Sequence, residues 1–212
     1  MAKTKKGRPL DRWQTPHQRV RGAQLRIIGG RFKGRLIEYS GDVRTRPMKD
    51  NIREAIFNLI GGWIPGKHVL DLFSGTGAVG LEAISRGAIH ATLIERHVPT
   101  VRTIRANIAN LEVQDHTTVI TSDTFFWFRR CLKDPAALPA DPWAVFCSPP
   151  YDFYVERGVE MMELIDGLLS TSPADSLFVV ESDLRFNVRD LPNSVQWKTR
   201  TYSPAQICVL RK

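Results

Sequence analysis

From Lys67 to Asp183 the sequence alternates between short apolar runs and segments with helical spacing. The apolar runs predict five strands, HVLDLF, HATLIE, TTVITSD, WAVFCS and SLFVVESD, and the segments between them predict helices. Strands that are apolar along their whole length and are joined through helices are typical of a parallel sheet covered on both faces. Two more apolar runs flank Ser203-Pro204 and predict an antiparallel pair. We therefore expect residues 67–212 to form a doubly wound α/β domain with a mostly parallel, seven-stranded sheet.

The N-terminal part of the chain is strongly basic. Residues 1–53 hold 15 of the 30 Lys and Arg residues against four acidic ones, in a chain whose net charge is +8. This distribution is typical of a surface that binds a polyanion such as RNA or DNA, although residues 1–24 could instead be a solubilising tail. We expect residues 1–24 to be disordered and residues 25–66 to form a basic β-hairpin followed by a helix from about Asp50, its candidate N-cap.

Other classes of protein are disfavoured by composition. The three cysteines have no CxxC spacing and the five histidines are scattered, so we expect no metal site and a reduced, cytoplasmic compartment. No run approaches the roughly 18 apolar residues of a membrane span. The basic N-terminus has no apolar segment of the kind found in a secretory signal.

A glycine-rich loop, Gly75-Thr-Gly77-Ala-Val-Gly80, follows the first predicted strand of the domain. Ligands of doubly wound sheets bind at the carboxyl ends of the strands, so this loop is a candidate binding site. Its spacing matches the dinucleotide fingerprint, and Glu95 lies 20 residues after Gly75, where a ribose-binding acid is expected. A nicotinamide-dependent oxidoreductase is therefore one interpretation.

Acidic residues around the loop favour a second interpretation. A pyrophosphate prefers a helix N-terminus without nearby carboxylates, whereas Asp71 precedes the loop and Glu82 follows it. S-adenosylmethionine has a positive ammonium and sulfonium and no phosphate, and Asp123 could reach its adenine amine. Asp71 and Asp123 could alternatively cap helices. The candidate cofactor-binding residues are Asp71, Phe73, Ser74, Gly75, Gly77, Glu95 and Asp123.

The fourth predicted strand ends in Ser148-Pro149-Pro150-Tyr151, here named the SPPY turn. An exocyclic base amine is a poor nucleophile because its lone pair is delocalised, so a methyltransferase needs acceptors that orient its N–H groups. The Ser148 hydroxyl and the Pro149 carbonyl are candidate acceptors, and Tyr151 could stack on a flipped-out base. The same residues could instead only connect a strand to a helix.

Taken together, the motifs resemble the bacterial small-subunit rRNA guanine-N2 methyltransferases of the RsmD type. The matching stretches are LRIIGGRFKGR from Leu25, TRP from Thr45, REAIFNL from Arg53 and VLDLFSGTGAVGLEAISRGA from Val69, and the SPPY turn resembles the tetrapeptide of amino-group methyltransferases of RNA and DNA. The resemblance implies a Rossmann-like class I methyltransferase that uses S-adenosylmethionine to modify a guanine of 16S rRNA, in the small subunit or an assembly intermediate. A monomer is the default expectation. It also implies rRNA contacts by Arg31, Lys33, Arg35, Arg44 and Arg46, with Arg46 near the base pocket.

Two positions depart from the family pattern. The family usually has Asp where this chain has Ser148, and Tyr-Gly where it has Tyr202-Ser203. An Asp would accept amine protons and offset the charge that develops on the amine, whereas Ser adds no charge. Asp152 could partly replace that carboxylate. Methylation of adenine N6 or cytosine N4 in RNA or DNA, and RNA binding without catalysis, therefore remain alternatives.

Overall fold

The computed structural model describes residues 24–39, 41 and 47–212, and a seven-stranded sheet with the order β5-β4-β3-β6-β7-β9-β8 lies at its centre. Strands β3 to β7 pair in parallel, while β9 is antiparallel to both β7 and β8. This confirms the predicted doubly wound, mostly parallel sheet. The strands are β3 (His68–Asp71), β4 (His90–Glu95), β5 (Thr117–Thr121), β6 (Trp143–Cys147), β7 (Leu177–Asp183), β8 (Lys198–Tyr202) and β9 (Ala205–Arg211).

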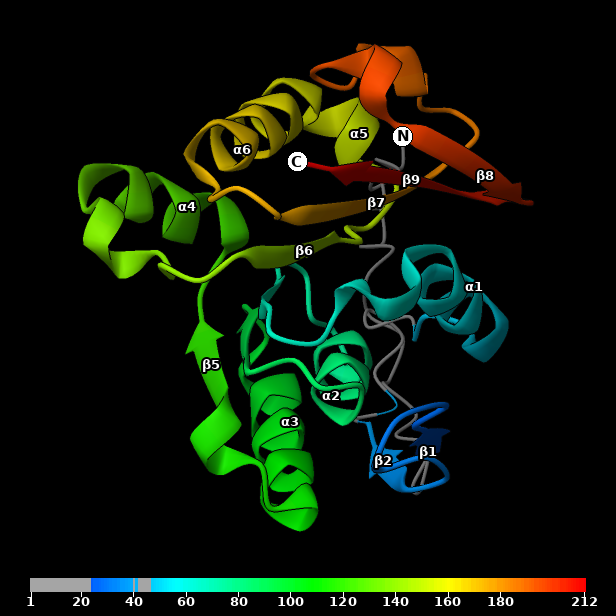
Figure 1. The fold of residues 1–212 in the computed structure, drawn as a ribbon, viewed down its shortest axis with the longest axis vertical. Coiled ribbons are helices and arrows are strands. Elements are labelled where there is room, and N and C mark those ends of the chain that lie inside the picture. The colour runs from blue at the N-terminus through cyan, green and yellow to red at the C-terminus, as the bar shows by residue number, and fades with distance from the viewer. Residues whose placement is uncertain (1–23, 40, 42–46) are drawn as a thin grey trace, which may run out of the picture.

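Helices cover both faces of the sheet, with α1, α2 and α3 on one face and α4, α5 and α6 on the other (Figure 1). The two faces bury separate apolar clusters because successive residues of each strand point to opposite sides. The short helix α5 was not predicted. The helices are α1 (Asp50–Ile60), α2 (Ala78–Ser85), α3 (Val98–Leu111), α4 (Thr124–Lys133), α5 (Phe153–Glu156) and α6 (Gly158–Thr171).

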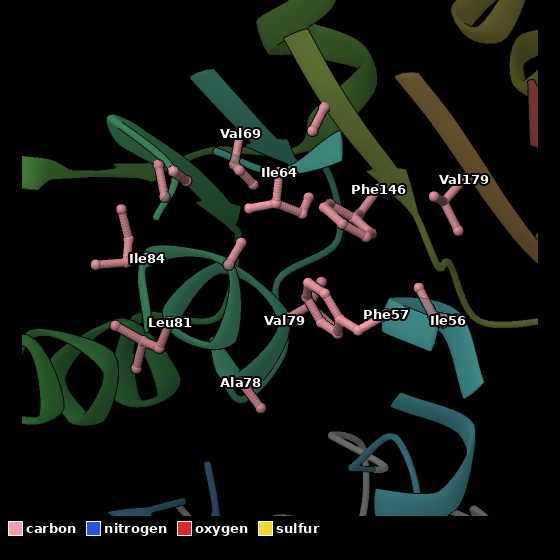
Figure 2. Close-up of a cluster of buried hydrophobic side chains, with 14 of the residues drawn as sticks. Ile56, Phe57, Ile64, Val69, Ala78, Val79, Leu81, Ile84, Phe146 and Val179 are labelled. Carbon is pink, nitrogen blue, oxygen red and sulfur yellow. The ribbon is translucent and has the colours of Figure 1, made fainter. Parts of the chain in front are cut away.

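Helix α1 packs into the apolar cluster of the first face. Phe57 lies beside Val79 of α2 and Phe146 of β6, with its ring centroid 5.6 Å from that of Phe146, and Ile56 lies on the side of Phe57 away from Val79 (Figure 2). The predicted N-cap is wrong by one residue. Lys49 occupies the cap position, and the Asp50 carboxylate pairs with Arg53 at 3.0 Å inside the first turn.

The predicted N-terminal hairpin is present, with β1 (Gln24–Arg26) antiparallel to β2 (Leu36–Glu38). Glu82 of α2 holds it against the domain, since its fully buried carboxylate accepts 2.7 Å hydrogen bonds from the backbone N–H groups of Ile28 and Gly29. Arg86 and Arg53 pair with the same carboxylate at 2.8 and 3.6 Å. The interpretation of Glu82 as a charge that repels a phosphate is therefore wrong, because these partners neutralise it.

Some predicted features lie outside the described residues, namely the tail up to residue 23 and the basic residues Arg44 and Arg46. Among the residues that are described, no helix is long and apolar enough to cross a bilayer. The same residues contain no group of three or more His, Cys, Asp or Glu side chains that could hold a metal ion. The three cysteines are buried and unpaired by disulfides.

Candidate active site

The glycine loop connects the end of β3 to the start of α2. Gly75 and Gly77 have φ values of +52° and +76°, in the left-handed region that favours glycine. A Cβ on Gly77 would also lie 3.2 Å from Ile104 of α3. The loop is tied to β4, because the Ser74 N–H donates to the Ile94 carbonyl at 3.0 Å. Gly77 is buried against α3, so the half-buried Gly75 is where the loop backbone is accessible to a ligand.

Asp71, the last residue of β3, has a buried carboxylate that accepts a 3.1 Å hydrogen bond from the Gly80 N–H. Burial raises the pKa of this carboxyl to about 7, against the opposing effect of the Gly80 hydrogen bond, and the charge of Glu95 raises it further. Asp71 thus supports the N-terminus of α2 directly. A cation bound at the loop would favour its ionised form.

Glu95 ends β4 and reaches back to the glycine loop. Its two carboxylate oxygens accept hydrogen bonds from the Gly75 N–H at 3.0 Å and the His97 N–H at 2.7 Å. The structure therefore brings Asp71, Gly75 and Glu95 together at neighbouring strand ends, as the sequence predicted for a binding site.

Asp123, after β5, caps helix α4. One carboxylate oxygen accepts from the N–H groups of Phe125 and Phe126 at 3.0 and 3.1 Å, and the other lies 3.5 Å from Arg157. The alternative reading of Asp123 as a helix cap is thus realised. A role in binding adenine stays a prediction.

An aromatic cluster lies next to Asp123. The rings of Phe73, Phe125 and Phe153 have centroids about 6 Å apart, and the Arg157 guanidinium lies 3.9 Å from the centroid of Phe125. Phe73 was a predicted site residue, whereas the other three were missed. The run Thr124-Phe125-Phe126 after a strand-ending acid was the available signal for Phe125, but Arg157 has no local signal.

The SPPY turn leaves the sheet beside the glycine loop, because β3 and β6 are parallel neighbours with Asp71 opposite Phe146. The turn leads into α5, where the carbonyls of Pro150 and Tyr151 accept hydrogen bonds from the N–H groups of Phe153 and Tyr154. The Pro149 carbonyl accepts no hydrogen bond within the turn. Tyr151 is half-buried and packs against the apolar cluster of the first face. The structure thus places both predicted motifs at one edge of the sheet.

The carboxylate beside the SPPY turn belongs to Glu181 of β7, which the sequence reasoning missed. The Tyr151 hydroxyl donates to Glu181 Oε1 at 2.7 Å. The suggestion that Asp152 supplies this charge is wrong, because its carboxylate is 65% exposed and pairs with Arg185 at 2.8 Å. The signal for Glu181 was an acid near the end of an otherwise apolar strand, SLFVVESD.

The predicted RNA contacts of the hairpin lie away from this edge. Arg31, Lys33 and Arg35 are exposed, but the Arg31 N–H donates to the carbonyl of Ser85 and the Arg35 guanidinium to that of Asn110. Both acceptors lie at the carboxyl ends of their helices. Since an eight-residue helix is about 12 Å long, the hairpin loop lies roughly a helix length from the glycine loop.

Comparisons with known proteins agree with this geometry. The family described as Conserved hypothetical protein 95 matches residues 25–211. The ribosomal RNA small subunit methyltransferase D of Escherichia coli is 32% identical over 173 residues, which cover 80% of this chain and 80% of that protein. The solved structure of the Escherichia coli protein yhhF covers 90% of this chain and 98% of its own, with 27% identity and a TM-score of 0.69.

A more distant structure shares the fold. It is the Thermus thermophilus 16S rRNA N2 G1207 methyltransferase in complex with AdoMet and guanosine, which is 15% identical and has a TM-score of 0.63. The match covers 90% of this chain and 50% of that one.

Proposed function

Because the chain belongs to the family described as Conserved hypothetical protein 95, that of the RsmD-type class I methyltransferases, we propose that it methylates the N2 amine of a guanine in 16S rRNA. The observation that carries the proposal is the position of the glycine loop and the SPPY turn on the adjacent strands β3 and β6. A methyl donor in the first and a base amine in the second would lie side by side.

The glycine loop fits S-adenosylmethionine as the donor. The loop backbone is half-buried at Gly75, Glu95 beside it would bind the ribose, and the buried Asp71 carboxylate favours a positive ligand over a pyrophosphate. The Thermus thermophilus structure that shares this fold contains AdoMet. When bound, the donor supplies an electrophilic methyl group on a positively charged sulfur.

The SPPY turn provides acceptors for the amine. The Ser148 hydroxyl and the Pro149 carbonyl, which has no acceptor role within the turn, accept the two N–H groups and turn the nitrogen lone pair toward the methyl group. Proline fixes φ at Pro149 and Pro150, so the backbone of the turn is ordered before the base arrives. The ring of Tyr151 contacts the base, a contact worth roughly 1–3 kcal/mol when a base stacks on an aromatic side chain.

The hairpin contacts rRNA at a distance from the modified base. Arg31 and Lys33 are exposed about a helix length from the glycine loop, so they bind phosphates of a neighbouring segment, not of the target nucleotide itself. Arg44 and Arg46 are proposed to contact the rRNA nearer the site. A substrate long enough to reach both regions is expected, which favours a folded rRNA or an assembled small subunit.

The direct test is transfer of a radiolabelled methyl group to small subunits, naked 16S rRNA and DNA, followed by identification of the modified nucleoside. N2-methylguanosine in rRNA supports the proposal. Because Ser148 is a neutral acceptor, the second candidate is another base amine, and N6-methyladenosine or N4-methylcytidine would support it. RNA binding without transfer would indicate a non-catalytic protein, and calorimetric binding of NAD(H) in preference to S-adenosylmethionine would indicate an oxidoreductase.

A further inference from the structure

Glu181 places a buried carboxylate directly beside the SPPY turn. Strands β6 and β7 are parallel and Cys147 lies opposite Val180, so Ser148 and Glu181 are the next residues of the two strands. Glu181 is only 8% exposed. Its backbone carbonyl accepts a 3.0 Å hydrogen bond from the Tyr154 hydroxyl, and its side chain accepts one from Tyr151. These two hydrogen bonds therefore fix the Glu181 carboxylate beside the SPPY turn.

The hydroxyl of Ser148 faces the same carboxylate. Ser148 Oγ is buried and has no hydrogen bond in the described part of the chain. Burial raises the pKa of the Glu181 carboxyl, and the hydroxyls of Tyr151 and Ser148 oppose this effect, in keeping with the adjacent positions of Ser148 and Glu181 at the ends of paired segments. A hydroxyl that turns its proton toward Glu181 keeps its lone pairs for a donor on the other side, such as an amine N–H.

No cation pairs with Glu181 within the described residues, where the neighbouring hydroxyls of Tyr151 and Ser148 oppose the effect of its burial on the pKa. The neighbouring acids are used elsewhere, since Asp152 pairs with Arg185 and Asp71 bonds to Gly80. Cys147 and Tyr154, in the apolar cluster of the other face, are also near Glu181, and burial raises the pKa of each of these two groups. Glu181 is thus a buried acid beside the SPPY turn that no described cation engages.

We propose that Glu181 is a positioning residue for the target amine, acting through Ser148 and Tyr151. This inference rests on the proposed function. During transfer the amine lone pair forms the N–C bond, and the C–S bond breaks with its electron pair on sulfur. The nitrogen becomes positive and then releases a proton to solvent. Glu181 orients the Ser148 hydroxyl and the Tyr151 ring, and its charge stabilises the positive nitrogen in the transition state.

The test compares single-turnover methyl transfer by the wild type, Glu181→Gln, Tyr151→Phe and their double variant. Glu181→Gln keeps an acceptor for Tyr151 but loses the charge. We expect it to lower the rate constant about 10- to 100-fold, with KM for RNA and Kd for S-adenosylmethionine within about twofold. The double variant should be no slower than the slower single variant. The matched control is Glu163→Gln on the exposed face of α6, which should match the wild type.

A rescue separates charge from packing. Ser148→Asp in the Glu181→Gln background restores a carboxylate at the turn and should recover most of the lost rate. A Glu181→Gln rate within twofold of the wild type would overturn the inference, as would effects that multiply in the double variant. A failed rescue would overturn it where Ser148→Asp alone remains active.

A second measurement needs no turnover, so it separates this inference from the proposed function. In protein labelled with 3-fluorotyrosine, the Tyr151 resonance is identified by its absence in Tyr151→Phe. The Tyr151 hydroxyl donates to Glu181 Oε1, so loss of the charge in Glu181→Gln should shift the Tyr151 resonance, whereas Glu163→Gln should leave it unchanged. A Tyr151 resonance unchanged in Glu181→Gln would overturn the inference even if the wild type methylates rRNA. A wild type inactive on every substrate would overturn the proposed function alone.

Discussion

The carboxylate of Asp71, at the end of β3, accepts a 3.1 Å hydrogen bond from the Gly80 N–H in the first turn of α2. Burial raises the pKa of this carboxyl from 3.8 to about 7. In the unfolded chain the same carboxyl ionises near its ordinary value. Between pH 4 and 7 the folded chain therefore holds a proton that the unfolded chain releases, and the contribution of Asp71 to stability falls as the pH rises through this window.

The first prediction concerns Asp71→Asn. Asn cannot ionise but keeps an acceptor for the Gly80 N–H, so it should remove the cost of ionising Asp71, which is about 4 kcal/mol at most. We expect the free energy of unfolding at pH 8 to equal or exceed that of the wild type, and its fall between pH 4 and 7 to be smaller. Urea unfolding at several pH values measures this. A variant less stable at pH 8 would contradict the buried-carboxylate assignment.

Asp71→Asn also tests whether the bound cofactor is positively charged. A cationic cofactor favours ionised Asp71, so the affinity of the wild type for S-adenosylmethionine should rise as the pH increases from 6 to 8. Asp71→Asn should bind more weakly at pH 8 and show little pH dependence. Calorimetry at these pH values measures both effects, and a steep pH dependence that survives in Asp71→Asn would place the titrating group elsewhere.

The third prediction separates the residue that contacts the base from those that bind the cofactor. Tyr151→Ala removes the ring that contacts the base but lies on the SPPY turn, not on the glycine loop. It should lose most of the turnover, about 100-fold if the base contact is worth roughly 3 kcal/mol, while the Kd for S-adenosylmethionine stays nearly unchanged. Turnover assays and calorimetry on one preparation measure the two quantities, and equal losses in both would argue against the assignment.

The alternation of strands and helices could be predicted from sequence because its signals are local. The helices over Val98–Leu111 and Thr124–Lys133 coincide with the predicted segments, since apolar spacing and capping residues lie within a few residues of each other. The acids at the ends of β3, β4 and β5 could be found for the same reason.

The partners of the acids could not be predicted. Glu82 accepts hydrogen bonds from Ile28 and Gly29, more than 50 residues away. Glu181 lies on β7 and accepts a hydrogen bond from Tyr151, which lies on the turn after β6. Such pairs depend on strand order and register, which a single sequence does not reveal. Glu82 and Asp152 were therefore assigned to ligand chemistry although ion pairs engage both of them.

The fourth prediction concerns Ser148→Asp with Glu181 intact. Two carboxylates at neighbouring strand ends repel, so one of them should take up a proton at neutral pH. Transfer to the amine should then equal or exceed that of the wild type above pH 8 and fall below it near pH 6.5. The pH–rate profile with N2-methylguanosine as the readout measures this. Loss of transfer at every pH in a folded variant would show that the pocket requires serine.

The fifth prediction concerns the attachment of the hairpin. Gly30 has a φ of +74°, and a Cβ there would lie 1.9 Å from the Ser85 carbonyl oxygen. Gly34, with a φ of +88°, would place its Cβ in open space. Gly34→Ala should therefore lower the free energy of unfolding only by the cost of holding alanine in a left-handed backbone conformation, about 1–2 kcal/mol. Gly30→Ala should cost more, because the backbone of Ser85 cannot move aside without disturbing α2.

The matched pair also tests whether the attached hairpin serves RNA binding. Both variants keep Arg31, Lys33 and Arg35, so their charge is unchanged. If rRNA contacts the hairpin and the SPPY turn together, Gly30→Ala should weaken rRNA binding while Gly34→Ala leaves it near the wild-type value. Filter binding at a fixed salt concentration measures the affinity, since phosphate contacts depend on salt. If the two variants bind rRNA equally and Gly30→Ala is only less stable, the attachment of the hairpin to α2 serves stability and not RNA binding.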